Sequence, residues 1–331
     1  MRRGARTNLA LLGLLGAAFL TGWLAFAFAT APARWSLLAH AVSGFAILLL
    51  LPWKSLIARR GVARPRRGRW ASVVFSILVL ASLLAGLLHS TGLLRWWGDL
   101  TAMDIHVGAA IAAVPFAAWH VARRRVRLRP ADLSRRSLLR GGAVIAGATL
   151  AYGASEAGVR VLGLAGARRR YTGSYDAGSF RPDQMPVSSW ILDPIPDIDP
   201  TAWRLEAGAR TWTYQELLRF DDQITATLDC TGGFCSTQEW SGAWLSRLLE
   251  PGDALSVRVV SATGYDRRFP VEELGRLLLA TRFGGVPLDP GHGFPVRLVA
   301  PERRGFWWVK WVRSLQLEGL PHWWQSPFPL Q

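Results

Sequence analysis

The sequence predicts a multi-domain protein, in which an all-α transmembrane helical bundle is followed by an α+β domain with a mixed sheet. Half of the 331 residues are hydrophobic, yet the net charge is +16. Residues 1–170 carry 24 Arg and Lys against 4 Asp and Glu, a balance of +20, whereas residues 171–331 carry 15 against 19, a balance of −4. Apolar runs long enough to cross a bilayer, about 20 residues, lie only in the first of these parts. The two parts are therefore different kinds of domain.

The apolar runs predict four strong membrane spans and a weaker fifth one, at residues 9–30, 35–53, 70–94, 102–121 and 141–159. Most of the tryptophans in this part lie near span ends, where the membrane interface favours them. A cleaved signal peptide does not explain the first span, because three stronger spans follow it. We expect residues 1–130 to form the four-helix bundle. Residues 131–170 then hold the fifth span and a linker, and residues 171–331 form the second domain.

The basic residues predict how these spans are oriented. Eighteen lie in the N-terminus, in segment 54–69 and in segment 121–140, whereas only Arg34 and Arg95 lie in the two loops between these regions. Cytoplasmic loops are enriched in Lys and Arg, so we expect an integral plasma membrane protein with a cytoplasmic N-terminus. Five spans would place the second domain in the periplasm or outside the cell. Because the positive excess lies beside membrane spans, we expect no nucleic-acid partner.

Segment 134–140, which reads SRRSLLR, precedes a mildly apolar run that is rich in Gly and Ala. This pattern resembles a twin-arginine export signal, which directs proteins that fold around a cofactor before export. The alternative is that these arginines only add to the positive charge on the cytoplasmic side.

Four of the six histidines lie in the predicted spans: His40, His89, His106 and His120. Ionisable side chains in membrane spans usually face the bundle interior and mark function. At about 1.5 Å per residue, the first three lie near one outer level and His120 lies at the cytoplasmic rim. Two imidazoles on facing helices at one depth are what a six-coordinate haem b requires. We expect His40 and His106 to be the haem ligands, with His89 as a substitute and His120 as a weaker candidate.

Two alternatives stay open for this cluster. The histidines could pack against neighbouring helices without a metal. Asp104, at a depth similar to that of His106, could orient a ligand or lie on a quinone-binding side. Taken together, the first four spans resemble the haem-b membrane subunits that exchange electrons with quinone or quinol.

Cys230 is the most informative residue of the second domain. It follows a predicted strand at 225–229, and Thr231-Gly232-Gly233 then allows a tight turn. Trp240-Ser241-Gly242 comes next, and we expect an amphipathic helix from there to Leu249. A thiol at a strand end can ligate a soft metal or act as a nucleophile. The alternatives are a buried cysteine or a disulfide with Cys235.

Several motifs follow Cys230 in order: the Trp240 segment, Gly264-Tyr265-Asp266, HGFPVR at 292–297 and WWVKW at 307–311. Over roughly residues 171–331 this pattern resembles the molybdopterin-binding domain of the sulfite oxidase family. The resemblance implies that Cys230 ligates molybdenum at the catalytic centre. It also implies pterin-phosphate contacts from His292, Arg297 and Lys310, and a weaker cofactor contact from Thr263. For each residue alone, the alternative is a solvated charge or a turn residue. We interpret Arg267, Arg268, Arg303 and Arg304 as surface charge.

The resemblances together predict a redox relay in one chain, from quinone through haem b to an exported molybdenum site that reduces small-molecule or protein sulfoxides. Sulfite oxidation is the alternative enzyme activity. It is less favoured, because the sulfite oxidases place an arginine soon after the cysteine and residues 231–234 contain none. A non-catalytic haem electron carrier or binding protein is the alternative from another class.

Overall fold

The computed structural model describes residues 2–62, 69–97, 100–123, 126, 129, 132, 134–188 and 194–326. The chain divides into two compact units. The first unit comprises Met1–Phe26 and Ala31–Gly173, and the second comprises Ala27–Thr30 and Ser174–Gln331. Each unit is described separately below.

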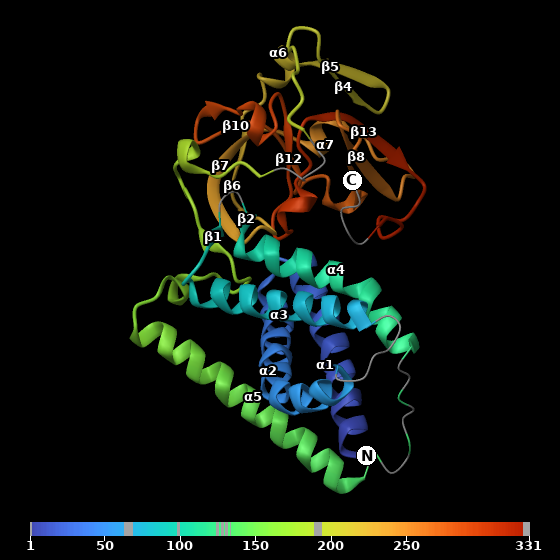
Figure 1. The fold of residues 1–331 in the computed structure, drawn as a ribbon. Helices are drawn as coiled ribbons and strands as arrows, with labels where there is room; N and C mark the ends of the chain where they lie inside the picture. Colours follow the sequence, from blue (N-terminus) through green and yellow to red (C-terminus); the bar gives the residue numbers. More distant parts are fainter. Residues whose placement is uncertain are drawn as a thin grey trace. The chain divides into compact units, whose positions relative to one another are not determined.

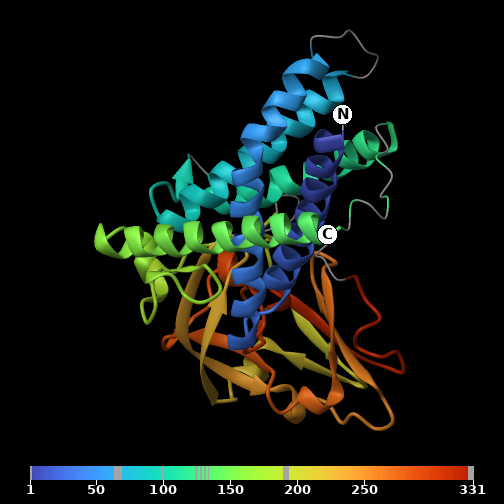
Figure 2. The ribbon, with the colours of Figure 1, turned by 90° about the horizontal axis from the view of Figure 1, so that it is seen from below.

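The first unit is built from five long helices: α1 (Arg2–Ala27), α2 (Arg34–Val62), α3 (Arg69–Thr91), α4 (Ala102–Arg123) and α5 (Arg135–Val161). Helices α3 and α4 pack along each other, and α5 packs against α2 (Figures 1 and 2). A short ribbon of β1 (Trp96–Trp97) and β2 (Leu100–Thr101) precedes α4.

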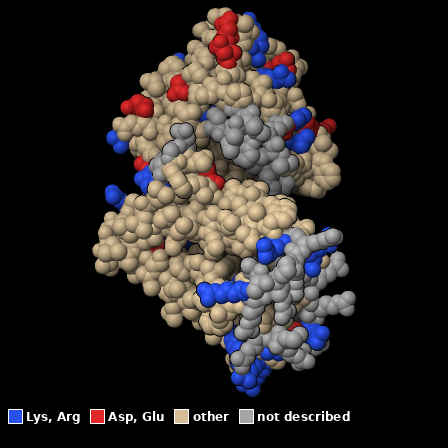
Figure 3. Space-filling model, in the orientation of Figure 1, with Lys and Arg blue, Asp and Glu red and all other residues tan. Residues whose placement is uncertain are grey.

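Four helical segments are long and apolar enough to cross a membrane: Gly4–Ala27, Ala31–Arg59, Arg69–Thr91 and Ala102–Arg123. They match the first four predicted spans. Large apolar side chains such as Leu20, Trp35 and Leu84 are exposed on these helices. In Figure 3 the left part of this unit is mostly tan, and Lys and Arg gather toward its lower right. The exposed apolar surface is suited to lipid.

The fifth predicted span differs from the other four. Residues 141–159 do form helix, as part of α5, but among the described helices α5 is not one of the four that are apolar enough to span a membrane. Its sequence is dominated by Gly and Ala and contains Glu156 and Arg160. Small side chains supply little apolar surface, so this prediction is not supported. The topology that depends on a fifth span stays a prediction.

A capping box starts α4. Thr101 Oγ1 accepts the Asp104 N–H at 2.9 Å, and the Asp104 carboxylate accepts the Thr101 N–H at 2.9 Å and its hydroxyl at 2.7 Å. These bonds satisfy backbone donors that would otherwise lack partners at a helix start. Asp104 therefore caps the helix, and within the described residues it makes no hydrogen bond to His106. The hydrogen bonds of Asp104 thus do not support the alternative that it orients a haem ligand.

The second unit contains two sheets, which confirms the predicted α+β fold with mixed strands. In the first sheet β11, β10, β7 and β3 lie in that order, with β12 beside β10 and β6 beside β7. In the second sheet the order is β5, β4, β13, β8 and β9. The pairs β3–β7 and β4–β13 are parallel, and the other pairs are antiparallel.

The strands of the first sheet are β3 (Tyr175–Asp176), β6 (Asp222–Asp229), β7 (Phe234–Trp244), β10 (Leu278–Phe283), β11 (Val286–Pro287) and β12 (Arg297–Val299). Those of the second are β4 (Arg204–Ala207), β5 (Arg210–Thr213), β8 (Ser256–Ser261), β9 (Asp266–Pro270) and β13 (Val312–Glu318). The short helix α6 (Tyr214–Leu217) begins with a capping box formed by Thr213 and Glu216.

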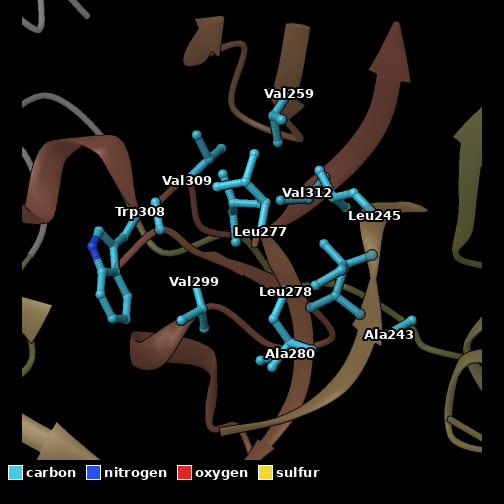
Figure 4. Close-up of a cluster of buried hydrophobic side chains, with 14 of the residues drawn as sticks. Ala243, Leu245, Val259, Leu277, Leu278, Ala280, Val299, Trp308, Val309 and Val312 are labelled. Carbon is cyan, nitrogen blue, oxygen red and sulfur yellow. The ribbon is translucent and has the colours of Figure 1, made fainter. Parts of the chain in front are cut away.

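Both sheets contribute to one hydrophobic core. Figure 4 shows Leu278 of β10, Val259 of β8 and Val312 of β13 converging with Trp308. Trp240 is fully buried beside them. Its ring stacks on Phe283, and its Nε1–H donates to Ala226 O at 3.1 Å. The core therefore ties β6, which leads to Cys230, firmly to β7 and β10.

The helix predicted between Gly242 and Leu249 is shorter than expected and begins later. Strand β7 continues to Trp244, and only Leu245–Leu248 forms a helical turn, α7. Gly242 explains the difference: it pairs with Ala280 of β10, and an added Cβ would lie 2.1 Å from Leu279 O. Close pairing on both edges of β7 thus outweighs the helical spacing of the leucines.

Candidate functional site

Cys230 lies in the tight connection between β6 and β7. Its N–H donates to Phe234 O at 2.8 Å, and its carbonyl accepts the Gly233 N–H at 3.2 Å. Gly233 has a φ of 93°, a left-handed conformation that favours glycine. The Cys230 Sγ accepts the Gly232 N–H at 3.3 Å and lies 3.4 Å from Ser188 Oγ. The thiol is therefore buried and held in one position by the backbone and by a serine from a distant segment.

Cys235 lies at the start of β7 and pairs with Asp229 across the ladder. Both cysteines are free and buried. The alternative of a disulfide between them is therefore not realised.

His292 ends a short 3₁₀ turn, Pro290–His292, which Asp289 caps. Asp289 Oδ1 accepts the His292 N–H at 2.8 Å, and Oδ2 faces the ring Nδ1. This contact leaves Nε2 buried and without a hydrogen-bond partner among the described residues. Burial lowers the pKa of His292, although Asp289 opposes that effect. His292 thus directs one unsatisfied ring nitrogen into the interior.

Arg297, on β12, is one of the largest fully buried side chains. Its guanidinium lies over the rings of Trp240 and Trp308, at 5.2 and 5.7 Å from their centroids, and Nη1 donates to His292 O at 3.0 Å. Within the described residues no carboxylate lies at ion-pair distance, and Nε has no partner. Burial lowers the pKa of Arg297 to about 9. A buried cation of this kind is suited to an anionic ligand.

Lys310 completes this group. Its Nζ donates to Ser188 O at 2.7 Å and to Gly291 O. Gly293 has a φ of 108°, and an added Cβ would lie 3.0 Å from Arg297 Cβ and 3.2 Å from Lys310 Cβ. The missing side chain at Gly293 therefore lets the two basic residues pack together beside His292.

The structure thus brings together four of the predicted site residues: Cys230, His292, Arg297 and Lys310. Ser188 joins them, because it contacts both the Cys230 thiol and Lys310. Ser188 is not among the residues predicted from the sequence, where its only signal is its place in a proline-rich segment. Thr263 is exposed in the turn after β8, and its hydrogen bonds go to Ser261. The structure does not join Thr263 to the other site residues.

Four arginines interpreted as surface charge are paired, and two of them are buried. Arg304 is 4% exposed and Arg267 is 3% exposed. Arg267 donates to Tyr265 Oη at 2.8 Å and lies among aromatic rings. Arg303 pairs with Glu273 and Arg268 with Glu318. The interpretation as surface charge is therefore wrong for Arg267 and Arg304.

In the first unit, the structure pairs His40 with His106. His40 Nδ1 lies 2.8 Å from Ala18 O of α1, and His106 Nδ1 lies 2.7 Å from Ser82 O of α3. The ring centroids are 5.6 Å apart, with an angle of 85° between the planes. Because Nδ1 of each ring faces a carbonyl, it carries the proton, and Nε2 keeps a lone pair.

Two glycines make room for these rings. A Cβ on Gly22 would lie 2.9 Å from His40 Nδ1, and a Cβ on Gly86 would lie 2.8 Å from His106 Nδ1. The imidazoles therefore lie directly against the backbones of α1 and α3.

The other two histidines of the first unit make different contacts. His89 is buried with its Nε2 3.0 Å from Gly173 O, so the atom that would bind iron is engaged. His120 Nδ1 lies 3.0 Å from Ser72 Oγ, and its ring packs on Phe75. The Nε2 contact of His89 does not favour a role as haem ligand. His120 is engaged through Nδ1, as His40 and His106 are, and stays a weaker candidate.

Comparison with known families supports the assignment of the second unit. The model of the oxidoreductase molybdopterin binding domain matches residues 192–322. This part of the chain is a molybdopterin-binding oxidoreductase domain of the sulfite oxidase type. The resemblance to that family is thereby confirmed for the second domain.

Relatives of the domain include the mitochondrial sulfite oxidases of Homo sapiens and Rattus norvegicus. They are 28% and 27% identical over 175 aligned residues, which cover 39% of this chain and 32% of each relative. The chain thus matches about a third of the length of these curated relatives. The sulfane dehydrogenase SoxCD from Paracoccus pantotrophus has a TM-score of 0.36 and 26% identity, covering 38% of this chain and 40% of that chain.

The donor set of the domain fits molybdopterin. The cofactor carries a phosphate, which needs cations and N–H donors. Arg297 and His292 offer buried nitrogens that lack partners among the described residues. Cys230 offers one soft thiolate ligand. Within the part of the chain that the structure describes, no group of three or more His, Cys, Asp or Glu side chains could hold a metal.

Arg297→Met should lower molybdenum content without lowering the stability of the cofactor-free protein. The lost phosphate contact is worth about 1.5–3 kcal/mol, whereas replacing an uncompensated buried charge by an apolar side chain is often stabilising. Because the folded-state pKa of about 9 lies well below the usual value for arginine, the unfolded chain binds more protons than the folded chain above pH 9. The stability of cofactor-free wild type should therefore rise as the pH increases above 9.

Metal analysis and thermal unfolding from pH 7 to 10 would check this prediction, with Arg276→Met as an exposed control. Arg276 is the matched choice because its side chain is 73% exposed. Full molybdenum content in Arg297→Met would mean that Arg297 does not bind the cofactor. A pH-independent difference in melting temperature between Arg297→Met and wild type would contradict the titration.

Proposed function

We propose that this chain is a membrane-anchored molybdenum oxidoreductase that passes electrons between quinone and an exported oxygen-atom-transfer site through haem b, and that it reduces sulfoxides. The observation that carries this proposal is the convergence of Cys230 with His292, Arg297 and Lys310 in the molybdopterin-binding domain. The four apolar helices, with paired histidines between them, support the membrane and haem parts.

In the second unit, Cys230 would hold molybdenum and the three basic residues would hold the pterin phosphate. The bound cofactor would supply a metal centre able to exchange an oxygen atom in a two-electron step. His292, held by Asp289 through Nδ1, would present its buried Nε2 to the phosphate and donate to it when the ring is protonated. Arg297 would supply a buried positive charge to the phosphate, and the Ser188 and Gly232 contacts fix the thiol.

In the first unit, His40 and His106 would hold haem b. Each ring presents Nε2 while its Nδ1 is bound to a backbone carbonyl, an arrangement typical of metal-ligating histidines. The centroid separation of 5.6 Å is of the order that a shared metal ion requires, since a metal–nitrogen bond is about 2 Å long. Haem supplies one-electron transfer to and from quinone.

The choice of sulfoxide rests on the surroundings of the thiol. Residues 231–234 provide no cation beside Cys230, and a neutral sulfoxide needs none. Arg297, a cation that interacts electrostatically with Cys230, is fully buried and engaged with His292 O. Sulfite oxidation is the second candidate, because the curated relatives are sulfite oxidases.

The extracytoplasmic location depends on α5. If the N-terminus is cytoplasmic, four spans return the chain to the cytoplasm. Export of the second unit then requires one of two things: α5 crosses the membrane, or the twin-arginine-like segment directs transport. A reporter fused after Gln331 in intact cells would decide this point. Activity of a cytoplasm-specific reporter there would contradict the exported location.

The function itself is tested by producing the chain in a host that makes molybdopterin. One molybdenum and one haem b per chain are expected, with quinol-driven reduction of sulfoxides and no oxidation of sulfite. Oxidation of sulfite alone would replace the proposed reaction by the second candidate. Haem without molybdenum in matured protein would instead indicate a non-catalytic electron carrier.

A further inference from the structure

A buried ion pair lies directly behind the Cys230 thiol. Asp229, the residue before Cys230, is fully buried, and Arg304 is 4% exposed. Arg304 Nη1 lies 2.9 Å from Asp229 Oδ1, and Ser174 Oγ donates to the same oxygen at 2.6 Å. Arg304 follows Asp229 by 75 residues, so this pair joins two distant segments of the second unit.

The same guanidinium also holds Cys230 itself. Arg304 Nη2 donates to the Cys230 carbonyl at 3.1 Å. Asp229 and Arg304 form a β-bridge, and a Cβ on the next residue, Gly305, would lie 3.2 Å from Cys230 Cα. One side chain therefore fixes the carbonyl of Cys230 and the carboxylate of its neighbour, while the backbone of its own segment packs against Cys230.

We infer that Arg304 is a positioning residue for the molybdenum ligand, acting through the Cys230 carbonyl and the Asp229 carboxylate. Breaking a buried ion pair by removing one partner leaves an uncompensated buried charge, which is strongly unfavourable. Here that charge would lie one residue from the thiolate, where it would repel a second negative group. Arg304 therefore sets both the position of Sγ and the charge around it.

This inference rests on the proposed ligation of molybdenum by Cys230, but its test also has a readout that needs no cofactor. In cofactor-free protein, the alkylation rate of Cys230 relative to Cys235 reports how firmly the Cys230 connection is held. Cys235 is the internal reference because it is equally buried, at 6% against 7%, and lies across the same strand pair. The molybdenum content and reduction potential of the loaded protein are the other readouts.

Arg304→Met should lower molybdenum content about tenfold or more, the usual cost of removing a residue that orients a metal ligand. It should also raise the Cys230-to-Cys235 alkylation ratio severalfold. In Arg304→Lys, the molybdenum content and the alkylation ratio should both lie between those of wild type and Arg304→Met. The reason is that one ammonium can replace one of the two contacts of the guanidinium. The double variant Asp229→Asn with Arg304→Met removes the buried charge, so it should fold while keeping the raised alkylation ratio.

Arg303→Met is the matched control. The neighbouring Arg303 pairs with Glu273 and stacks on Phe269 and Trp307 without a contact to Cys230 among the described residues. It should leave the alkylation ratio, molybdenum content and reduction potential unchanged. Wild-type values in Arg304→Met and in the double variant, or equal changes in Arg303→Met, would overturn the positioning role. Wild type that binds no molybdenum would instead contradict the proposed function, and the alkylation ratio would still test the inference.

Discussion

Replacement of Cys230 by serine or alanine is expected to reduce turnover to background and to remove molybdenum from the purified chain. The thiolate is the soft ligand that this connection offers to the metal, and neither replacement supplies one. The strands on both sides keep their ladder, so the domain should still fold. Because His40 and His106 belong to the other unit, the haem spectrum should be unchanged. Metal analysis, a spectrum of the reduced protein and a sulfoxide assay measure all three.

Cys235→Ala is the matched control for Cys230. Its side chain is equally buried but lies on β7, and its loss should cost about 1 kcal/mol, the typical effect of a point mutation. Activity should persist. An essential Cys235 together with a dispensable Cys230 would move the metal assignment five residues along the chain.

Sequence motifs predict part of the site. Cys230 follows a strand with alternating β-branched residues, and the HGFPVR and WWVKW segments place His292, Arg297 and Lys310 in order. Their convergence follows from the fold of the family. The spacing of Thr213 and Glu216 likewise indicates the capping box that the structure shows, because a capping box involves only four consecutive residues.

The parts that could not be predicted depend on contacts between distant segments. An arginine such as Arg304 is usually a surface residue. Only its ion pair with Asp229, 75 residues earlier, explains why it is buried. Ser188 reaches the thiol from an extended segment without a regular pattern. Strand β7 continues through Trp240 because β6 and β10 pair with both of its edges, which no local periodicity reveals.

The histidines of the first unit illustrate the same limit. Counting residues placed three of them at one depth, but depth alone cannot distinguish His89 from its neighbours. The structure separates them by hydrogen bonding. His40 and His106 bind carbonyls through Nδ1, whereas His89 engages Gly173 through Nε2.

Alanine at His40 or at His106 is expected to remove the low-spin haem b spectrum and to stop quinol-driven turnover. Each substitution would delete one of the two proposed axial ligands, and one remaining imidazole would not form a six-coordinate low-spin iron. Reduction of sulfoxide by a soluble dye should survive, because the molybdenum site lies in the other unit. His120→Ala is the control, since its contacts are Ser72 and Phe75, and it should keep the spectrum.

A second kind of variant tests the same site and leaves both histidines in place. Gly86→Val should disturb the haem, because even a Cβ at this position would lie 2.8 Å from His106 Nδ1. Gly108→Val is its control, since a Cβ on Gly108, in the same helix as His106, meets no atom within 4 Å. If His40→Ala, His106→Ala and Gly86→Val all retained a normal haem spectrum, the ligand assignment would be wrong. Loss of dye-driven activity in all three would mean that these residues support the fold of the whole chain rather than electron transfer alone.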